Sequence, residues 1–262
     1  MATNAQTVIW SDDFNDQDIT DWTLVDADGD GLNWAAVQII DEEEEPVGTP
    51  MLRSASWNSV LGPLTPNNWI ISPAVDLSNY PAGSTVNLNW FVKASDADWD
   101  AEKYSVYVST SNDPTVMVTS AISMTETTLD GFNELSARTL NIGALAGEAV
   151  VYIAFRHYDS SDMFTMEIDD VSVTGTALST EDFFRNNLTM YPNPVNDVLN
   201  IDAKSGVINN ITVTEINGRT VKNIDANGLS TSRVNTGDLT SGVYFVTVQT
   251  AEGKGTSKFI KN

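Results

Sequence analysis

The chain has 262 residues, enough for one large or two modest domains, and its 36 acidic and 13 basic side chains give a net charge of −23. A surface this acidic repels phosphate backbones and anionic lipid, which argues against nucleic-acid binding. The sequence contains no cysteine, which excludes disulfides and thiolate metal sites, and it lacks the run of about 18 apolar residues that a membrane span requires.

The charge is unevenly distributed along the chain. Residues 1–175 hold 28 of the acids and 5 of the bases, whereas residues 176–262 hold 8 of each. We therefore expect an acidic part and a neutral part with a boundary near 174–188. The first residues of this boundary segment, 174–180, are mostly small and polar. The acidic part would destabilise itself through repulsion unless something offsets its charge, and bound divalent cations are the simplest remedy.

The N-terminus lacks the apolar core of a signal peptide. Thr3-Asn4-Ala5 is nevertheless similar to the small-residue tail of a cleavage site, with Gln6 as the first mature residue. We expect a trimmed export precursor in which Met1 is a start residue.

Strand patterns dominate the acidic part, and no segment of the chain shows a convincing helical period. Apolar and polar side chains alternate over residues 86–92, 104–108, 150–154 and 164–168. Such alternation buries one face of a strand and leaves the other in water. Clusters of Gly, Pro, Asn and Asp separate the runs, so this part is predicted to be a β-sandwich of jelly-roll type.

The neutral part repeats the pattern on a smaller scale. Alternating runs cover 199–203, 211–213 and 244–248, and a last strand is expected around Phe259. Asn217-Gly218 offers the positive φ values of a type I′ hairpin turn. Pro192 and Pro194 lack N–H groups, so residues 191–195 can only be an edge or entry segment. A small, Ig-like antiparallel β-sandwich is predicted.

The acids of residues 26–31 have the spacing of half a calcium loop. Asp26, Asp28 and Asp30 stand at the first, third and fifth positions, and Gly31 at the sixth permits a sharp turn. Val37 occupies the twelfth position, where an EF-hand needs a bidentate glutamate, so an EF-hand is excluded. A solvated acidic turn is the alternative, but three acids in five residues with intervening glycine favour a cation.

A second set of acids alternates just before the 104–108 run: Asp96, Asp98, Asp100 and Glu102. In an extended chain these carboxylates would share one face and crowd each other, and metal ligation by some of them is one interpretation. A loop that points them apart is an equally good interpretation.

A third set lies at the two ends of the sandwich. The first and last strands of a jelly roll often lie together, which would bring Asp12-Asp13 and Asp169-Asp170 within reach of one ion. The acidic run at residues 41–45 is more simply interpreted as a solvated loop.

Two patterns raise the question of catalysis. His157 is the only histidine, and nothing around Ser160 or Ser161 resembles a nucleophile elbow, so a packing or hydrogen-bonding role on a strand is expected. Glu167-Ile168-Asp169 resembles the Glu-x-Asp core of some jelly-roll glycoside hydrolases, which need a second carboxylate about 5 Å away. Val171 and Ser172 occupy the places where that second glutamate is expected, so the pair is incomplete.

Residues 8–174 resemble the cleaved-adhesin, or choice-of-anchor J, domain of gingipain-type haemagglutinins. The resemblance rests on the order of short motifs: Asp12-Asp13-Phe14, residues 22–31, Asn33-Trp34, residues 54–57, residues 66–73, residues 101–107, residues 154–157 and residues 168–171. It implies a galactose-binding-like jelly roll with structural calcium and a surface-binding role. It also implies that Asp26, Asp28 and Asp30 form the acidic loop of that family, with Asp12 and Asp169 matching at the two ends of the sandwich.

Residues 178–262 resemble the type A C-terminal sorting domain of cargo of the type IX secretion system of Bacteroidetes. The residues that carry the resemblance are Tyr191, Pro192, Asn193, Pro194, Gly218, Gly242, Tyr244 and Lys258. It implies passage through the type IX translocon, docking on an outer-membrane shuttle barrel and removal by a surface sortase.

These interpretations combine into one expectation: an adhesin-like jelly roll over 6–175, a linker over 176–187 and a sorting domain over 188–262. The protein is expected to be a non-enzymatic, calcium-stabilised binding protein at the cell surface or outside the cell, with a surface glycan or protein as its ligand. The predicted metal ligands are Asp12, Asp26, Asp28, Asp30, Asp96 and Asp169. The alternative is a carbohydrate-binding module or glycoside hydrolase on the same fold, because six tryptophans of the acidic part offer surface for sugar stacking, although core packing is their commoner role.

Overall fold

The computed structural model of the chain describes residues 6–40, 45–128, 134–177 and 179–262. The expected cleavage-site tail at residues 3–5 and residues 41–44 of the acidic run lie outside these ranges. Among the residues that are described, no helix is long and apolar enough to cross a membrane.

The chain forms two compact units. The first comprises Gln6–Asn79 and Thr85–Thr176, and the second comprises Tyr80–Ser84 and Ala177–Asn262. Both are built from β-strands, which confirms the predicted all-β class.

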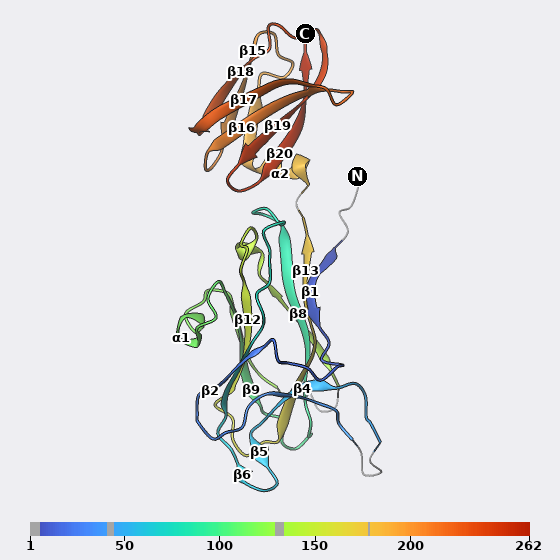
Figure 1. Cartoon of the computed structure of the whole chain (residues 1–262), viewed down its shortest axis with the longest axis vertical. Coiled ribbons are helices and arrows are strands. Elements are labelled where there is room, and N and C mark those ends of the chain that lie inside the picture. The colour runs from blue at the N-terminus through green and yellow to red at the C-terminus, as the bar shows by residue number, and fades with distance from the viewer. Residues whose placement is uncertain (1–5, 41–44, 129–133, 178) are drawn as a thin grey trace. The chain divides into compact units, whose positions relative to one another are not determined.

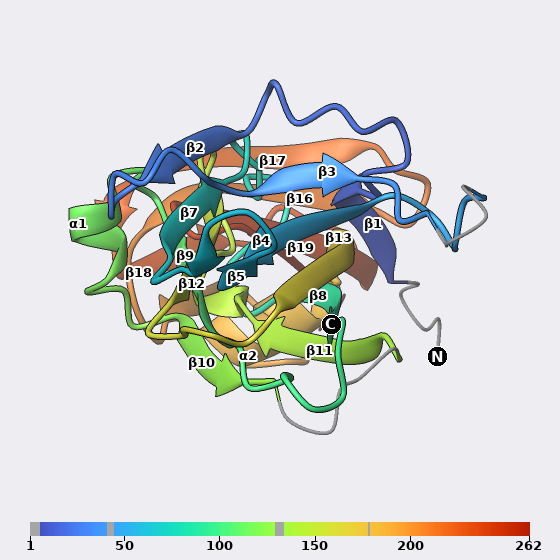
Figure 2. The same ribbon diagram turned by 90° about the horizontal axis from the view of Figure 1, so that it is seen from below.

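The first unit contains two facing antiparallel sheets (Figures 1 and 2). The strands of the larger sheet are β1 (Thr7–Asp12), β3 (Ala35–Val37), β4 (Met51–Ala55), β8 (Thr85–Ala94), β11 (Ser136–Asn141) and β13 (Thr165–Thr176). The strands of the smaller sheet are β2 (Thr23–Asp26), β7 (Asn67–Ile71), β9 (Lys103–Ser109), β10 (Ser123–Thr127) and β12 (Tyr152–Tyr158). The first sheet follows the order β11-β8-β13-β4-β3 with β1 beside β13, and the second the order β10-β9-β12-β7-β2. A short hairpin, β5 (Trp57–Asn58) and β6 (Gly62–Pro63), completes the unit.

The core lies between these two sheets. The alternating residues of β8 that were predicted to face inward are each at most 1% exposed: Val86, Leu88, Trp90 and Val92. Trp90 meets Phe155 of β12 edge-on, with ring centroids 5.9 Å apart, so the sheets touch through aromatic side chains. Each such side chain contributes about 1.5–3 kcal/mol when it is fully buried. The predicted sandwich is confirmed.

The first and last strands of this unit pair directly, as predicted. β1 lies beside β13 (Figure 1) and runs antiparallel to it. Asp12 stands opposite Val171 in this pairing. This pairing brings the Asp12-Asp13 and Asp169-Asp170 segments to neighbouring strands.

The second unit also contains two antiparallel sheets. Its strands are β14 (Leu188–Tyr191), β15 (Val198–Ala203), β16 (Ile208–Glu215), β17 (Thr220–Leu229), β18 (Thr231–Asn235), β19 (Gly242–Thr250) and β20 (Lys254–Lys261). The sheets follow the orders β14-β15-β18 and β17-β16-β19-β20 and enclose a separate hydrophobic core. β14 is an edge strand that ends at Tyr191, as the two prolines after it require.

The hairpin turn between β16 and β17 differs from the predicted type. Gly218 has a φ of +85°, but Asn217 does not have positive φ, so the turn is not type I′. Gly218 N–H donates to Glu215 O at 2.9 Å, and Glu215 N–H donates to Arg219 O at 2.9 Å. This pattern fits a type I turn followed by a left-handed glycine, in which only the last position needs positive φ.

Two short helices were not predicted from the sequence, because neither is long enough to show a helical period. Helix α1 (Pro114–Met117) begins after Asp113, whose carboxylate accepts from Thr115 N–H. Helix α2 (Thr180–Asn187) begins after Ser179, whose hydroxyl accepts from Asp182 N–H. A 3₁₀ turn, η1 (Gly143–Leu145), adds a third. Helix α2 lies in the segment expected to be a linker, and its Phe184 belongs to the core of the second unit.

Candidate functional site

The acidic loop begins where β2 ends, at the edge of the smaller sheet of the first unit. Ala27 N–H donates to Asn67 O of β7 at 3.1 Å, which holds the start of the loop against the sheet. Gly29 and Gly31 have φ values of +78° and +83°. Only glycine adopts these values without strain, and they let the chain turn twice within five residues.

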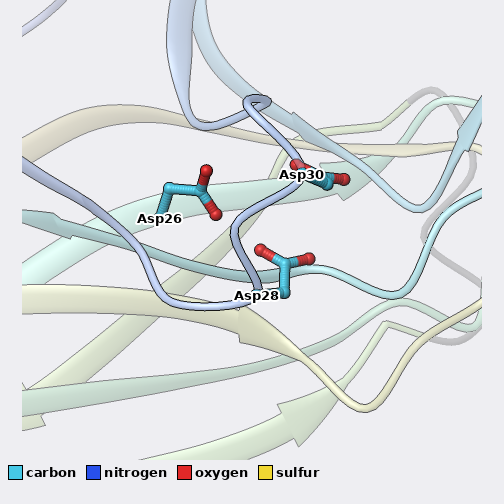
Figure 3. Close-up of side chains that lie close together, drawn as sticks. All are labelled: Asp26, Asp28 and Asp30. Carbon is cyan, nitrogen blue, oxygen red and sulfur yellow. The ribbon is translucent and has the colours of Figure 1, made fainter.

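The turn brings three carboxylates together. One oxygen from each of Asp26, Asp28 and Asp30 lies within 4.8 Å of the others. Figure 3 shows the side chains on one loop, with the carboxylates of Asp26 and Asp28 turned toward each other. Asp26 accepts from Gly29 N–H at 2.7 Å and from Gly31 N–H at 2.9 Å, so the backbone orients its carboxylate.

The electrostatics of the loop are uneven. Backbone N–H of Gly31 is the main cause that lowers the pKa of Asp26, with smaller contributions from Asp28 and from Gly29 N–H. Partial burial is the first cause that raises the pKa of Asp28, followed by its hydrogen bond with Asp26 and by the charge of Asp30. The ionised form of Asp28 is therefore made less favourable by its surroundings, first by burial and then by its acidic neighbours.

This donor set fits a hard divalent cation. Calcium binds six to eight oxygens at about 2.3–2.6 Å, so two of its ligand atoms lie at most about 5 Å apart. The 4.8 Å limit on the three carboxylate oxygens is compatible with that geometry. Asp26, Asp28 and Asp30 would hold the ion, which would neutralise their mutual repulsion, and backbone carbonyls or water would supply the other ligands.

Asp12 is held differently from the acids of the loop. Its two carboxylate oxygens accept from Phe14 N–H at 3.0 Å and from Trp22 Nε1–H at 2.8 Å. Because each oxygen retains a further lone pair, the carboxylate can still face a cation. Its role as a metal ligand stays a prediction.

Asp169 is only 3% exposed and is the most perturbed acid of this region. Burial raises its pKa to about 6, and the charges of Asp170 and Asp13 add to the effect. It accepts from Asp170 N–H at 2.8 Å and from Thr49 Oγ1 at 3.4 Å. The topology thus places Asp13 and Asp169 within electrostatic reach, but in the described part of the chain only Asp26, Asp28 and Asp30 form a group of three close ligand atoms. Ligation by Asp169 also stays a prediction.

The alternating acids 96–102 do not share a face, because they lie in the loop between β8 and β9 and not on a strand. Asp96 accepts from Asp98 N–H at 2.9 Å, and Asp98 is exposed. Glu102 is instead fully buried. The loop interpretation therefore describes this segment better than the extended one, and ligation by Asp96 stays a prediction.

Glu102 belongs to a buried network with the single histidine, which the sequence did not indicate. His157 Nε2 lies 2.9 Å from Glu102 Oε2, and its Nδ1 lies 2.8 Å from Ser54 Oγ. Ser56 Oγ–H donates to Glu102 Oε1 at 2.8 Å. Ser54, Glu102 and His157 are at most 2% exposed, so this serine–histidine–glutamate arrangement has no access to substrate. It joins β4 and β12 to the chain just before β9, which is the hydrogen-bonding role expected of His157.

Glu167 of β13 is likewise fully buried. It pairs with Arg53 Nε at 2.7 Å and accepts from Thr165 Oγ1–H at 3.0 Å and from Ser95 Oγ–H. A buried carboxylate that is held by an arginine and two hydroxyls is not presented to a glycosidic bond.

In the second unit, several of the predicted sorting residues lie on or beside the C-terminal strand β20. Asn193 Nδ2–H donates to Lys258 O at 3.3 Å, and Ile260 N–H donates to Asn193 Oδ1 at 2.9 Å. The Pro192-Asn193-Pro194 segment is therefore fastened along β20. Tyr191 Oη–H donates to Asp202 at 2.8 Å on the neighbouring strand.

The remaining sorting residues have structural roles within the same unit. Tyr244 stacks on Phe259 with ring centroids 5.5 Å apart. Gly242 pairs with Lys261 across β19 and β20, and Gly218 closes the β16–β17 turn.

Comparison with known proteins agrees with both units. The Cleaved Adhesin Domain family matches residues 7–173, and the Secretion system C-terminal sorting domain family matches residues 189–262. Hemagglutinin A of Porphyromonas gingivalis is 29% identical over 215 residues, covering 73% of this chain and 8% of the relative. Gingipain R1 of the same organism is 30% identical over 186 residues, covering 64% of this chain and 10% of the relative. The chain thus spans a tenth or less of the length of these two relatives.

Two crystal structures of cleaved adhesin domains of Lys-gingipain from Porphyromonas gingivalis are similar to the first unit. The K3 domain has a TM-score of 0.53 and 26% identity, covering 65% of this chain and 99% of that domain. The K1 domain has a TM-score of 0.50 and 28% identity, covering 67% of this chain and 99% of that domain. The sorting family marks its chains for export by the type IX system to the cell surface or the medium. The chain therefore belongs to the cleaved adhesin domain family, and its adhesin domain is followed in the sequence by a secretion system C-terminal sorting domain.

Proposed function

We propose that the protein is an exported, non-enzymatic binding protein whose adhesin domain is stabilised by calcium and attaches to a ligand at a cell surface. The observation that carries the proposal is the succession of a cleaved adhesin domain and a sorting domain in one chain. The names of the related proteins, hemagglutinin and cleaved adhesin, denote attachment and support a surface-binding role. The ligand would be a surface glycan or protein.

Calcium would bind first at the acidic loop. Asp26, Asp28 and Asp30 supply three converging oxygens, and a bound cation would offset the repulsion between their charges. Asp12 and Asp169, on the paired first and last strands, are candidates for a second site. Asp96 is a further candidate.

The sorting domain would be handled in three steps: passage through the type IX translocon, docking on an outer-membrane shuttle barrel and removal by a surface sortase. Asn193 and Lys258 lie on one exposed surface, which supports that segment as the docking face. We propose the domain boundaries 6–175 and 188–262, with a connecting segment at 176–187 that contributes Phe184 of α2 to the core of the second unit.

A glycoside hydrolase is the alternative, and the buried, ion-paired state of Glu167 argues against it. A sugar-release assay on polysaccharide substrates separates the two functions. No release is expected from the native chain. Release that disappears in Glu167→Gln, with the melting temperature unchanged, would favour the hydrolase.

Export and attachment are tested together in a type IX-competent host. The full chain should reach the surface or the medium, and a variant lacking 178–262 should stay in the cell. The exported protein should then bind members of an immobilised array of glycans and cell-surface proteins. Normal export of the truncated chain would overturn the sorting assignment, and a chain that binds nothing on the array, with or without calcium, would overturn the binding role.

A further inference from the structure

An aromatic pocket of about 340 Å³ lies on the first unit, apart from the acidic loop. We call it the Trp57–Trp99 pocket, and it is lined by Trp57, Asp96, Trp99, Asp162, Met163 and Phe164. These residues come from β5, from the loop that follows β8 and from the segment that precedes β13. Three segments that are distant in sequence therefore converge on it.

The aromatic wall of the pocket is fixed by backbone hydrogen bonds. Ser56 N–H and Trp57 N–H donate to Phe164 O at 3.1 and 3.3 Å, and Asp162 N–H donates to Ser56 O at 3.2 Å. The rings of Trp57 and Phe164 lie 5.8 Å apart and are tilted by 50°. Because these hydrogen bonds hold Trp57 and Phe164 in place, a ligand meets a preformed surface.

Trp99 lines the pocket from the loop that follows β8 and is 49% exposed. Leaving so much indole surface in water is unfavourable by itself, since apolar burial is worth about 25 cal/mol per Å². The other tryptophans that were considered for sugar stacking mostly pack in the core: Trp22, Trp34, Trp69 and Trp90 are each at most 5% exposed. Trp99 is thus the indole most available to a partner.

The two carboxylates of the pocket are not neutralised by the protein. In the part of the chain that the structure describes, neither Asp96 nor Asp162 has an ion-pair partner. Arg53, Lys103 and Arg138 are each paired with another acid. The region of residues 1–175 also holds the whole net charge of −23, so the long-range field attracts cations and repels anions.

We propose that the Trp57–Trp99 pocket receives a lysine or arginine side chain from a partner protein. The indole faces take the apolar stem and attract the cation, and Asp96 and Asp162 accept hydrogen bonds from its charged end. Charge favours this occupant over a neutral sugar. A sugar can stack on the indoles and donate its hydroxyls to Asp96 and Asp162, but it does not compensate their charge and gains nothing from the surrounding negative field. The inference rests on the proposed surface-binding function and names the chemistry of its partner.

The test is a titration of the full chain with short glycine-flanked peptides that carry one arginine or one lysine. The matched peptides carry citrulline, which keeps the shape of arginine without its charge, or norleucine, which keeps the apolar stem of lysine without its amine. Tryptophan fluorescence follows binding, and all seven tryptophans precede residue 100, within the adhesin domain. We expect the basic peptides to bind, the neutral ones not to bind, and affinity to fall as salt is raised.

Two exposed pocket residues are replaced, and one exposed neighbour serves as the control. Trp99→Ala and Asp162→Asn should each weaken binding of the basic peptides by about tenfold. Asp98→Asn removes a nearby charge that does not line the pocket and should leave affinity within about twofold. Melting temperatures of the three variants, expected to be unchanged, exclude misfolding as the cause.

Several outcomes would overturn the proposal. One is binding of the citrulline peptide as tight as that of the arginine peptide. Another is salt-insensitive binding of neutral oligosaccharides that depends on Trp99 but not on Asp162. A third is suppression of peptide binding by calcium but not by sodium at equal ionic strength, which would assign the carboxylates to a metal. If native export and array binding persist while both pocket variants bind the array normally, the pocket assignment alone fails and the surface-binding function stands.

Discussion

Truncation of Glu102 to alanine is the most informative perturbation of the adhesin domain. Glu102 was one of four alternating acids in the sequence, yet the structure buries it and leaves Asp98 exposed. Glu102→Ala removes the partner of His157 Nε2 at 2.9 Å and of Ser56 Oγ at 2.8 Å. Both groups would then be buried without their partner.

The expected cost is about 3–5 kcal/mol, because removing one partner leaves the other buried and uncompensated. Each unmet buried polar group alone costs about 1–3 kcal/mol. For a unit of this size, 1 kcal/mol shifts the melting temperature by about 2–4 °C, so a decrease of about 6–20 °C is predicted.

Thermal melting of the full chain, followed by tryptophan fluorescence, measures this loss in the adhesin domain alone. Asp98→Ala, in the same loop but exposed, should stay within about 0.5 kcal/mol of the native chain. Glu102→Gln should lie between them, since an amide keeps the shape and can bond both neighbours. The reasoning is refuted if Glu102→Ala melts like Asp98→Ala, or if it abolishes a response to calcium that the native chain shows.

Two further predictions concern other parts of the chain. Glu126 accepts from Tyr104 Oη–H at 2.8 Å and pairs with Arg138, so Glu126→Gln should cost about 1–3 kcal/mol in urea unfolding at neutral pH. Burial raises the pKa of Glu126, but hydrogen bonds from Arg138 and Tyr104 outweigh it and hold the pKa below the ordinary 4.5. The glutamate's contribution to the free energy of unfolding is therefore complete above pH 4.5 and is lost as the pH falls through the folded-state pKa. A stability difference between the native chain and Glu126→Gln that does not shrink in acid would contradict this explanation. Gly255→Ala should destabilise the sorting domain by about 1–3 kcal/mol, because the new Cβ would lie 2.9 Å from Phe184 Cα. Circular dichroism should show an earlier melting step for that domain while tryptophan fluorescence melting stays unchanged; equal shifts in both signals would contradict a local clash.

Local patterns explain what the sequence predicted well. The inward face of β8 follows from alternation among neighbours along the strand, which does not depend on the rest of the fold. The acidic loop was also accessible, because the 26, 28, 30 spacing and the glycines at 29 and 31 act within one turn.

Long-range packing explains what the sequence did not predict. Glu102 and His157 are 55 positions apart, and nothing near either residue shows that β9 and β12 would place them 2.9 Å apart. The same holds for the Trp57–Trp99 pocket, which needs three separate segments. Helix α2 had a local signal in Ser179 and Asp182, but its single short amphipathic face was too brief to show a period.

Stabilisation of the adhesin domain by calcium is the central claim, and its melting temperature tests that claim most directly. The melting temperature of the adhesin domain is recorded by tryptophan fluorescence in excess chelator and in calcium at about 100 times the dissociation constant. Binding at that ratio contributes about 2.7 kcal/mol, which corresponds to a rise of about 5–10 °C. Asp28→Asn should reduce the rise, because it removes one of three converging oxygens. An unchanged melting temperature in the native chain, with chelator and with calcium, would contradict the account.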